Sequence, residues 1–219
     1  MCGRFTNQYT WRQLHELYSL TDKDMVRSNF PPRYNIAPTQ LSFVVRENES
    51  KRELAELRWG LLPHWAKSPS DGARMINARS ETVATSPAYR AAFKSRPCLV
   101  VADGFYEWKK VEGGKQPYFI TTKANKPFAL AGLWEPKSIA ERDTFTILTC
   151  EPNTLCAQVH DRMPVILAPK DWPKWFSTPE TRLKLLNSFP ANQMEMWPVT
   201  KAVGSPKNTG SELVTPIKL

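Results

Sequence analysis

The chain has 219 residues, of which 41% are hydrophobic, and 30 Lys and Arg against 21 Asp and Glu give it a net charge of +9. This length and composition are typical of one domain, or at most two small ones, with a sizeable core, and they exclude fibrous, disordered and small disulfide-rich proteins. No apolar run reaches the roughly 18 residues of a membrane helix, and no signal peptide is visible, so we expect no membrane partner.

Three segments are predicted to form helices. Apolar residues recur at helical spacing over residues 10–20, where Thr10 and Gln13 fit a capping box. Two further helices are expected over residues 87–93 and 179–189, because each begins with a proline, which is favoured in the first turn of a helix.

Most of the remaining chain is predicted to form strands. Apolar runs follow one another without a helix after each, and residues 112–115 are typical of a hairpin turn. This order favours a mainly antiparallel α+β protein over a doubly wound parallel sheet, as a single domain over residues 1–219. The expected strands are 41–46, 57–62, 98–110, 118–122, 128–135, 144–151 and 164–168.

The four cysteines are expected to be free thiols, because nothing marks the chain as secreted. Cys98 and Cys150 end or begin apolar runs, which favours burial in the core. Cys150, Cys156 and His160 supply only three candidate ligands at a spacing atypical of zinc, so we expect no metal. Cys156 is expected to pack in the core, although a Cys156–His160 nucleophile pair is conceivable.

The positive charge lies on the folded body rather than in a basic tail, and residues 74–96 carry its densest part. A basic body favours a polyanionic partner, with nucleic acid first, although a merely solvated basic surface has the same charge. The chain also has eight tryptophans. Most are expected in the core, but aromatic rings beside basic residues can stack on the bases of single strands.

Cys2 is the most informative residue near the N-terminus. A small second residue permits removal of Met1, which would place a thiol and a free α-amine on one residue. An α-amine has a pKa of about 7.7–8.0, so a useful fraction is neutral and nucleophilic at neutral pH. Such an aminothiol condenses with an aldehyde to a Schiff base and then to a thiazolidine ring. Alone, the position of this cysteine is weak evidence, and an incidental second residue is the simpler interpretation.

Three other polar residues lie where predicted strands end. Asn77 is followed by Arg79, Glu107 is embedded among aromatic residues, and His160 precedes Asp161 and Arg162. An apolar setting raises the pKa of a carboxyl group and suits it to proton transfer. Each of these residues could instead belong to a structural hydrogen-bond network.

Seven short segments, in this order, resemble the SRAP family, the SOS response-associated peptidases that are also called abasic-site processing proteins. Together they span essentially the whole chain, and their agreement in order makes the resemblance specific. The segments are residues 1–5, 33–38, 58–65, 76–81, 102–108, 130–135 and 160–164, with the sequences MCGRF, RYNIAP, RWGLLPHW, INARSE, ADGFYEW, LAGLWE and HDRMP.

The resemblance implies one compact α+β domain with a strongly curved, barrel-like β core flanked by short helices. It implies binding of single-stranded DNA at an abasic site and a reversible thiazolidine crosslink between mature Cys2 and the ring-opened sugar aldehyde. Such a crosslink shields the lesion from strand cleavage. In this family Cys2 would be the nucleophile through its amine and thiol, and Asn77 would hold the sugar or adduct. Glu107 would move protons, and His160 would serve the Schiff-base chemistry.

The family also implies a DNA-binding set. Arg4, Arg79 and Arg162 would hold phosphates, and Trp108 would pack beside the site. No cofactor or metal is required, and we expect a monomer in the cytoplasm that joins the nucleoid when it is bound to DNA. The absence of the C-terminal tail of eukaryotic members makes the chain look bacterial in type.

Two other functions fit the same residues. A cysteine peptidase would use Cys2 on an amide, with Asn77 at the oxyanion and His160 or Glu107 as base, and would remove Met1 itself. A non-covalent nucleic-acid binding module would need no chemistry at Cys2.

Overall fold

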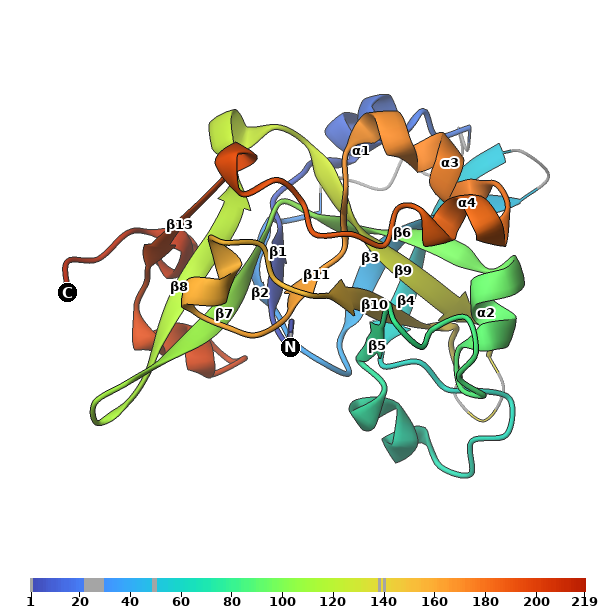
Figure 1. The fold of residues 1–219 in the computed structure, drawn as a ribbon, viewed down its shortest axis with the longest axis horizontal. Helices are drawn as coiled ribbons and strands as arrows, with labels where there is room; N and C mark the ends of the chain where they lie inside the picture. The colour runs from blue at the N-terminus through green and yellow to red at the C-terminus, as the bar shows by residue number, and fades with distance from the viewer. Residues whose placement is uncertain (1, 22–29, 49–50, 138, 140) are drawn as a thin grey trace.

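The computed structural model describes residues 2–21, 30–48, 51–137, 139 and 141–219. Strands dominate the chain and form two sheets, with few and short helices (Figure 1). The expected α+β class is therefore confirmed.

The first sheet, sheet A, has five strands in the order β13-β8-β7-β1-β2, and every pairing in it is antiparallel. Its longest members are β7 and β8, which form the hairpin predicted around residues 112–115. This hairpin projects from the body at the lower left of Figure 1. The strands are β1 (Phe5–Asn7), β2 (Arg33–Ile36), β7 (Gly104–Val111), β8 (Gly114–Thr122) and β13 (Met194–Pro198).

The second sheet, sheet B, closes on itself. Strands β10, β4, β3, β6 and β9 pair in succession, and β9 pairs back with β10, so the sheet curves into a ring. The pairing is mainly antiparallel, as expected, but β10 runs parallel to both β4 and β5. The strands are β3 (Leu41–Asn48), β4 (Lys51–Trp59), β5 (Asn77–Arg79), β6 (Pro97–Ala102), β9 (Phe128–Glu135), β10 (Thr144–Cys150), β11 (Met163–Pro164) and β12 (Ile166–Leu167).

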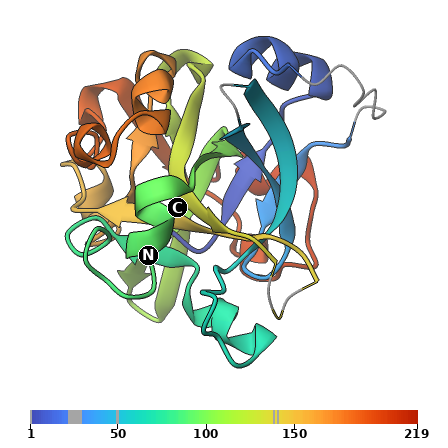
Figure 2. The ribbon, with the colours of Figure 1, turned by 90° about the vertical axis from the view of Figure 1, so that its right-hand side faces the viewer.

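Short helices pack around the sheets. Helix α1 has the predicted capping box of Thr10 and Gln13, and it lies with α3 and α4 at the upper end of the molecule in Figures 1 and 2. None of the helices in the described parts of the chain is long and apolar enough to cross a membrane. The α-helices are α1 (Trp11–Tyr18), α2 (Arg90–Ser95), α3 (Trp172–Phe176) and α4 (Pro179–Leu183). The 3-10 helices are η1 (Pro69–Arg74), η2 (Lys123–Asn125), η3 (Cys156–Gln158), η4 (Pro169–Asp171), η5 (Ala191–Gln193), η6 (Lys201–Gly204) and η7 (Ser211–Val214).

Several predicted boundaries were wrong. The expected strand 98–110 is two strands, because the chain passes from sheet B to sheet A at Asp103. The Asp103 side chain accepts hydrogen bonds from Thr6 and from the amide N–H of Gln8, so its polar contacts replace regular pairing there. The expected helices 87–93 and 179–189 are shorter, with α2 beginning at Arg90 and α4 ending at Leu183.

The main core lies inside the ring of sheet B and between the ring and the inner face of sheet A. A smaller cluster around Tyr106, Phe119 and Val203 joins sheet A to the C-terminal segment. Cys98, Cys150 and Cys156 are buried free thiols, as predicted.

Arg182 is a fully buried cation that joins three helices. Its guanidinium donates to the carbonyl oxygens of Trp175, Ser177 and Lys94 at 3.2, 2.8 and 2.8 Å. Because removal of the guanidinium leaves these carbonyls without donors, we expect Arg182→Ala to lower the free energy of unfolding by about 3 kcal/mol or more. Urea unfolding measures this, and the exposed Lys184→Ala should change it by less than about 0.5 kcal/mol. Equal small losses for both variants would contradict this prediction.

Candidate active site

Cys2 lies at the start of the segment that leads into β1. The amide N–H of Tyr106 in β7 donates to the carbonyl oxygen of Arg4 at 2.9 Å. Because the two segments run antiparallel, the residues before Arg4 pass alongside those after Tyr106, which brings Cys2 near Glu107. The Cys2 side chain is fully buried, and this burial, with the nearby Glu107 charge, raises the pKa of its thiol. The thiol therefore keeps its proton at neutral pH.

Asn77 reaches Cys2 from the other sheet. It is the first residue of β5, which runs parallel to β10, and its side-chain Nδ2 donates to the carbonyl oxygen of Cys2 at 2.8 Å. The Asn77 Oδ1 is buried and accepts no hydrogen bond from the described residues. An acceptor is thus available beside Cys2 for a hydroxyl group of a bound molecule.

Glu107 is the buried carboxyl group of the site. It lies in β7, its side chain is 2% exposed, and burial raises its pKa to about 7. At neutral pH both its protonated and its ionised form are therefore populated, which suits a group that must give and take a proton in one reaction. The sequence-based expectation of a raised pKa in an aromatic setting is met.

His160 follows the short helix η3, and its amide N–H donates to the carbonyl oxygen of Cys156 at 2.9 Å. Burial lowers the pKa of the ring below its ordinary value of 6.5, so His160 is neutral at pH 7. Its Nδ1 accepts from the amide N–H of Arg162 at 3.0 Å, which leaves Nε2 to carry the proton. The exposed carboxylate of Asp161 lies 2.8 Å from the same Nδ1 and favours the protonated ring when pH falls.

Arg162 is held against the end of β10. Its guanidinium makes a two-pronged ion pair with Glu81 at 2.7 and 2.9 Å and also donates to the carbonyl oxygen of Thr149 at 2.6 Å. The ion pair lowers the pKa of Glu81 and fixes the orientation of the guanidinium plane. Sequence analysis did not predict the Glu81 partner, which lies 81 residues away along the chain.

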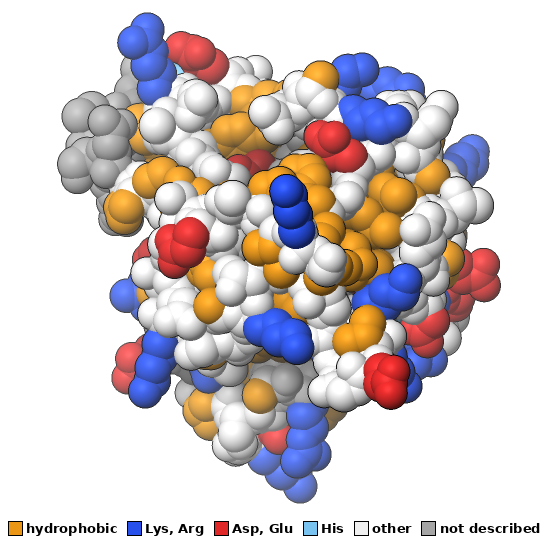
Figure 3. Space-filling view, turned by 90° about the vertical axis from the view of Figure 1, so that its left-hand side faces the viewer, with side chains coloured by type: hydrophobic (Ala, Val, Ile, Leu, Met, Phe, Trp, Pro, Cys, Tyr) orange, Lys and Arg blue, Asp and Glu red, His pale blue; other side chains and the backbone are white. Residues whose placement is uncertain are grey.

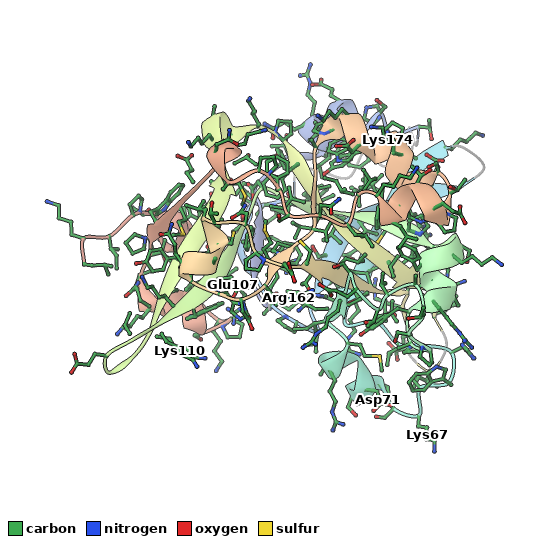
Figure 4. The ribbon with its side chains drawn as sticks, in the orientation of Figure 1. Lys67, Asp71, Glu107, Lys110, Arg162 and Lys174 are labelled. Carbon is green, nitrogen blue, oxygen red and sulfur yellow. The ribbon has the colours of Figure 1, made fainter. Side chains whose placement is uncertain are left out.

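A hollow of about 640 Å³ lies beside His160 and is lined in part by Trp108. Lys109, Lys110 and Lys115 of the β7–β8 hairpin contribute its positive charge. In the view of Figure 4, Lys110 and Arg162 lie on opposite sides of Glu107. Sequence analysis did not single out these lysines, although their position on both sides of the predicted hairpin turn was a usable signal.

The remaining predicted DNA-binding residues lie in two different settings. Arg79 ends β5 and is exposed. Arg4 is half-buried and donates to Asn35 and to the carbonyl oxygen of Val203, both at 2.7 Å, with its guanidinium over the Trp108 ring at 5.9 Å. Arg4 thus fastens the C-terminal segment to the strand that leads from Cys2. Its phosphate-binding role, like that of Arg79, stays a prediction.

The face of the molecule that carries the projecting end of sheet A has a mixed surface. Figure 3 shows hydrophobic side chains gathered near its centre, with Lys and Arg side chains spread around them. The fold and the site together define an α+β protein in which a buried cysteine, a half-buried asparagine and a buried carboxyl group come together, and a lysine-lined hollow lies beside His160.

The comparisons assign this chain to a family. The family model described as SOS response associated peptidase (SRAP) matches residues 1–206. The chain is 38% identical over 222 residues to the abasic site processing protein YoqW of Bacillus subtilis, covering 98% of this chain and 99% of that protein. It is 31% identical over 229 residues to the abasic site processing protein YedK of Escherichia coli, covering 99% and 100%. The chain therefore belongs to the SRAP family.

A solved structure supports the fold. A protein from Bacteroides thetaiotaomicron superposes with a TM-score of 0.86 at 22% identity, covering 99% of this chain and 100% of that one. The α+β architecture described above is thus shared with a known structure.

Proposed function

We propose that this chain binds single-stranded DNA at abasic sites and, after removal of Met1, forms a reversible thiazolidine crosslink through Cys2. The observation that carries the proposal is the burial of Cys2 against Asn77, 2.8 Å from its carbonyl oxygen, beside a carboxyl group with a pKa of about 7. The names of the curated relatives, which are abasic site processing proteins, support the choice of lesion.

The chemistry needs one group that can both give and take a proton. The neutral α-amine of Cys2 adds to the sugar aldehyde and gives a carbinolamine. Protonated Glu107 gives its proton to the carbinolamine hydroxyl, water leaves, and an iminium ion forms. The sulfur then bonds to the iminium carbon while the thiol proton passes to Glu107, which closes the ring and restores the acid. Reversal follows the same steps backwards.

The neighbouring residues support this sequence of steps. The free Oδ1 acceptor of Asn77 suits a sugar hydroxyl, because a buried acceptor without a donor is otherwise costly. The neutral ring of His160 carries its proton on Nε2, so it can donate a hydrogen bond to the oxygen of the carbinolamine during the Schiff-base chemistry.

A denaturing gel tests the proposal. Processed protein is mixed with single-stranded DNA that carries one abasic site, and intact mass confirms that Met1 is absent. The expected result is a heat-stable band at the mass of protein plus DNA, which undamaged DNA does not give. If a correctly processed chain forms no adduct, the crosslinking function is wrong, and turnover of a peptide without DNA would favour the peptidase.

The lysine-lined hollow makes a prediction about the bound strand. Replacing Lys109, Lys110 and Lys115 together by Ala removes up to three phosphate contacts. A plot of log affinity against log salt has a negative slope, and its magnitude should decrease by about 2, at roughly 0.7 for each phosphate of a single strand. Fluorescence anisotropy with undamaged single-stranded DNA measures this without any chemistry at Cys2.

A matched triple variant provides the control. Lys123, Lys174 and Lys184 are exposed lysines outside the hollow, and Figure 4 shows Lys174 at the far end of the molecule from Lys110. Their replacement by Ala removes the same net charge and should leave the salt slope within about 0.5 of the wild-type value. If both triple variants lower the slope equally, the hollow does not hold the strand.

A further inference from the structure

The peptide group of Asn77 lies at an unpaired edge of its strand. In the parallel pairing of β5 with β10, the carbonyl oxygen of Ile76 accepts from Ile147 at 3.1 Å, and the amide N–H of Ser80 donates to Thr149 at 2.8 Å. Because alternate residues of a strand point their peptide groups to opposite edges, the carbonyl of Asn77 faces away from β10. No second described strand pairs with β5 on that edge.

At this unpaired edge of β5, Tyr89 provides the hydrogen-bond donor that a neighbouring strand would otherwise provide. Its hydroxyl donates to the carbonyl oxygen of Asn77 at 3.1 Å. Tyr89 directly precedes α2, and its ring packs against the main core, so the hydroxyl is held by a fixed support. The same Asn77 donates through its side chain to the carbonyl oxygen of Cys2 at 2.8 Å. Two hydrogen bonds therefore connect Tyr89, at the N-terminal end of α2, through Asn77 to Cys2.

We propose that Tyr89 is a positioning residue for the reaction at Cys2: its hydroxyl fixes the peptide plane of Asn77 and so aims the Asn77 side chain. The proposal rests on the function proposed above. Trp59 and Ile147 hold the preceding carbonyl oxygen of Ile76, whereas the Tyr89 hydroxyl is the described donor to the carbonyl oxygen of Asn77 itself. Side-chain direction follows the backbone dihedrals, so a rotation of this peptide plane moves Nδ2 and Oδ1 away from the reacting atoms. The Tyr89 hydroxyl contacts the backbone of Asn77, and Tyr89 does not line the hollow beside His160.

The first test is Tyr89→Phe, which removes the hydroxyl and keeps the packed ring. Loss of one hydrogen bond that holds a reacting geometry should slow adduct formation by about 3- to 10-fold. Non-covalent affinity for undamaged single-stranded DNA should stay within about twofold, because Tyr89 is outside the lysine-lined hollow. An unchanged rate, or an affinity that falls by the same factor as the rate, would overturn the proposal.

A matched control removes an equivalent bond elsewhere. The hydroxyl of Thr122 donates to the carbonyl oxygen of Lys126 at 2.6 Å, and its side chain is buried at the end of β8. Thr122→Val therefore loses a hydroxyl hydrogen bond without touching Asn77, and its adduct should form within about twofold of the wild-type rate. Equal slowing by Tyr89→Phe and Thr122→Val would indicate a general loss of stability and would count against Tyr89.

A double-mutant cycle separates positioning from a structural role. In an Asn77→Ala background Tyr89→Phe should slow the reaction by no more than about twofold, because the side chain that it aims is gone. The same 3- to 10-fold slowing in both backgrounds would overturn the proposal.

The positioning can also be observed without the reaction. Hydrogen exchange of the Asn77 side-chain amide, followed by NMR in the free protein, should become faster in Tyr89→Phe and stay unchanged in Thr122→Val. This readout holds even if the wild-type chain forms no adduct, so failure of the proposed function is distinguished from failure of the positioning role. An unchanged exchange rate in Tyr89→Phe would refute the role.

Discussion

Cys2→Ser is expected to lose most of the heat-stable adduct with abasic single-stranded DNA and to keep the initial Schiff base. The α-amine is unchanged, so an imine still forms, but the hydroxyl closes a less stable ring than the thiol does. We expect at least a roughly tenfold loss of heat-stable band, and mild reductive trapping should recover a covalent product from the imine. The two assays together separate the contribution of the amine from that of the thiol.

Two controls define this experiment. Cys98→Ala removes another buried thiol, in β6, and should leave the heat-stable band in place. Wild-type protein that retains Met1 has no α-amine on Cys2 and should give no heat-stable product, because the thiazolidine needs the amine and the thiol on one residue. A heat-stable band from Cys2→Ser equal to that of the wild type would show that the thiol is dispensable and would refute the thiazolidine.

Glu107→Gln should have the second large effect. An amide neither gives nor takes the proton, so adduct formation should slow by roughly 10²- to 10⁴-fold with little change in affinity for undamaged DNA. In the wild type the reaction should slow as pH rises above about 8, because the α-amine is then already neutral while Glu107, with a pKa of about 7, continues to lose its proton. Single-turnover rates between pH 5 and 9 measure this decline, which Glu107→Gln should lack. A variant rate within threefold of the wild-type rate would remove Glu107 from the mechanism.

The same substitution has a stability signature of known sign. Burial raises the pKa of Glu107 in the folded state from 4.5 to about 7. The protonated side chain therefore makes its full contribution to the free energy of unfolding below the unfolded-state pKa, and this contribution is lost as pH rises through about 7. Relative to the wild type, Glu107→Gln should therefore gain stability at pH 9 compared with pH 4. Glu112→Gln, at an exposed position of the hairpin turn, should show no such trend.

Long, strongly patterned elements were the predictable part of the fold. Residues 41–48 and 128–135 are strands much as expected, because apolar residues dominate 41–45 and 128–134. By contrast β1 and β5 have three residues each, too few for any period to emerge, and they exist because longer strands pair with them. The break at Asp103 coincides with an Asp-Gly pair, which is typical of a turn, but this pair alone does not predict that the chain passes to another sheet.

The site likewise has a part that was predictable from the sequence and a part that was not. The residues that carry chemistry stand in recognisable segments, and Cys2, Asn77 and Glu107 do come together. Their partners could not be predicted, because the ion pair of Glu81 with Arg162 depends on which strands meet at β10. Contacts between distant segments are properties of the topology rather than of any local pattern.

The strand order also determines when, during protein synthesis, the segment that contains Cys2 can become buried. The segment that contains Cys2 and β1 pairs with β7, which ends at Val111. The ribosome therefore completes β7 about a hundred residues after it has made Cys2. At roughly 5–20 residues per second, the ribosome needs on the order of 5–20 s to reach that point. Throughout this interval the first residues of the nascent chain lack their β7 partner and are accessible to an aminopeptidase. Late docking of an early strand thus allows a residue that ends fully buried to be processed first.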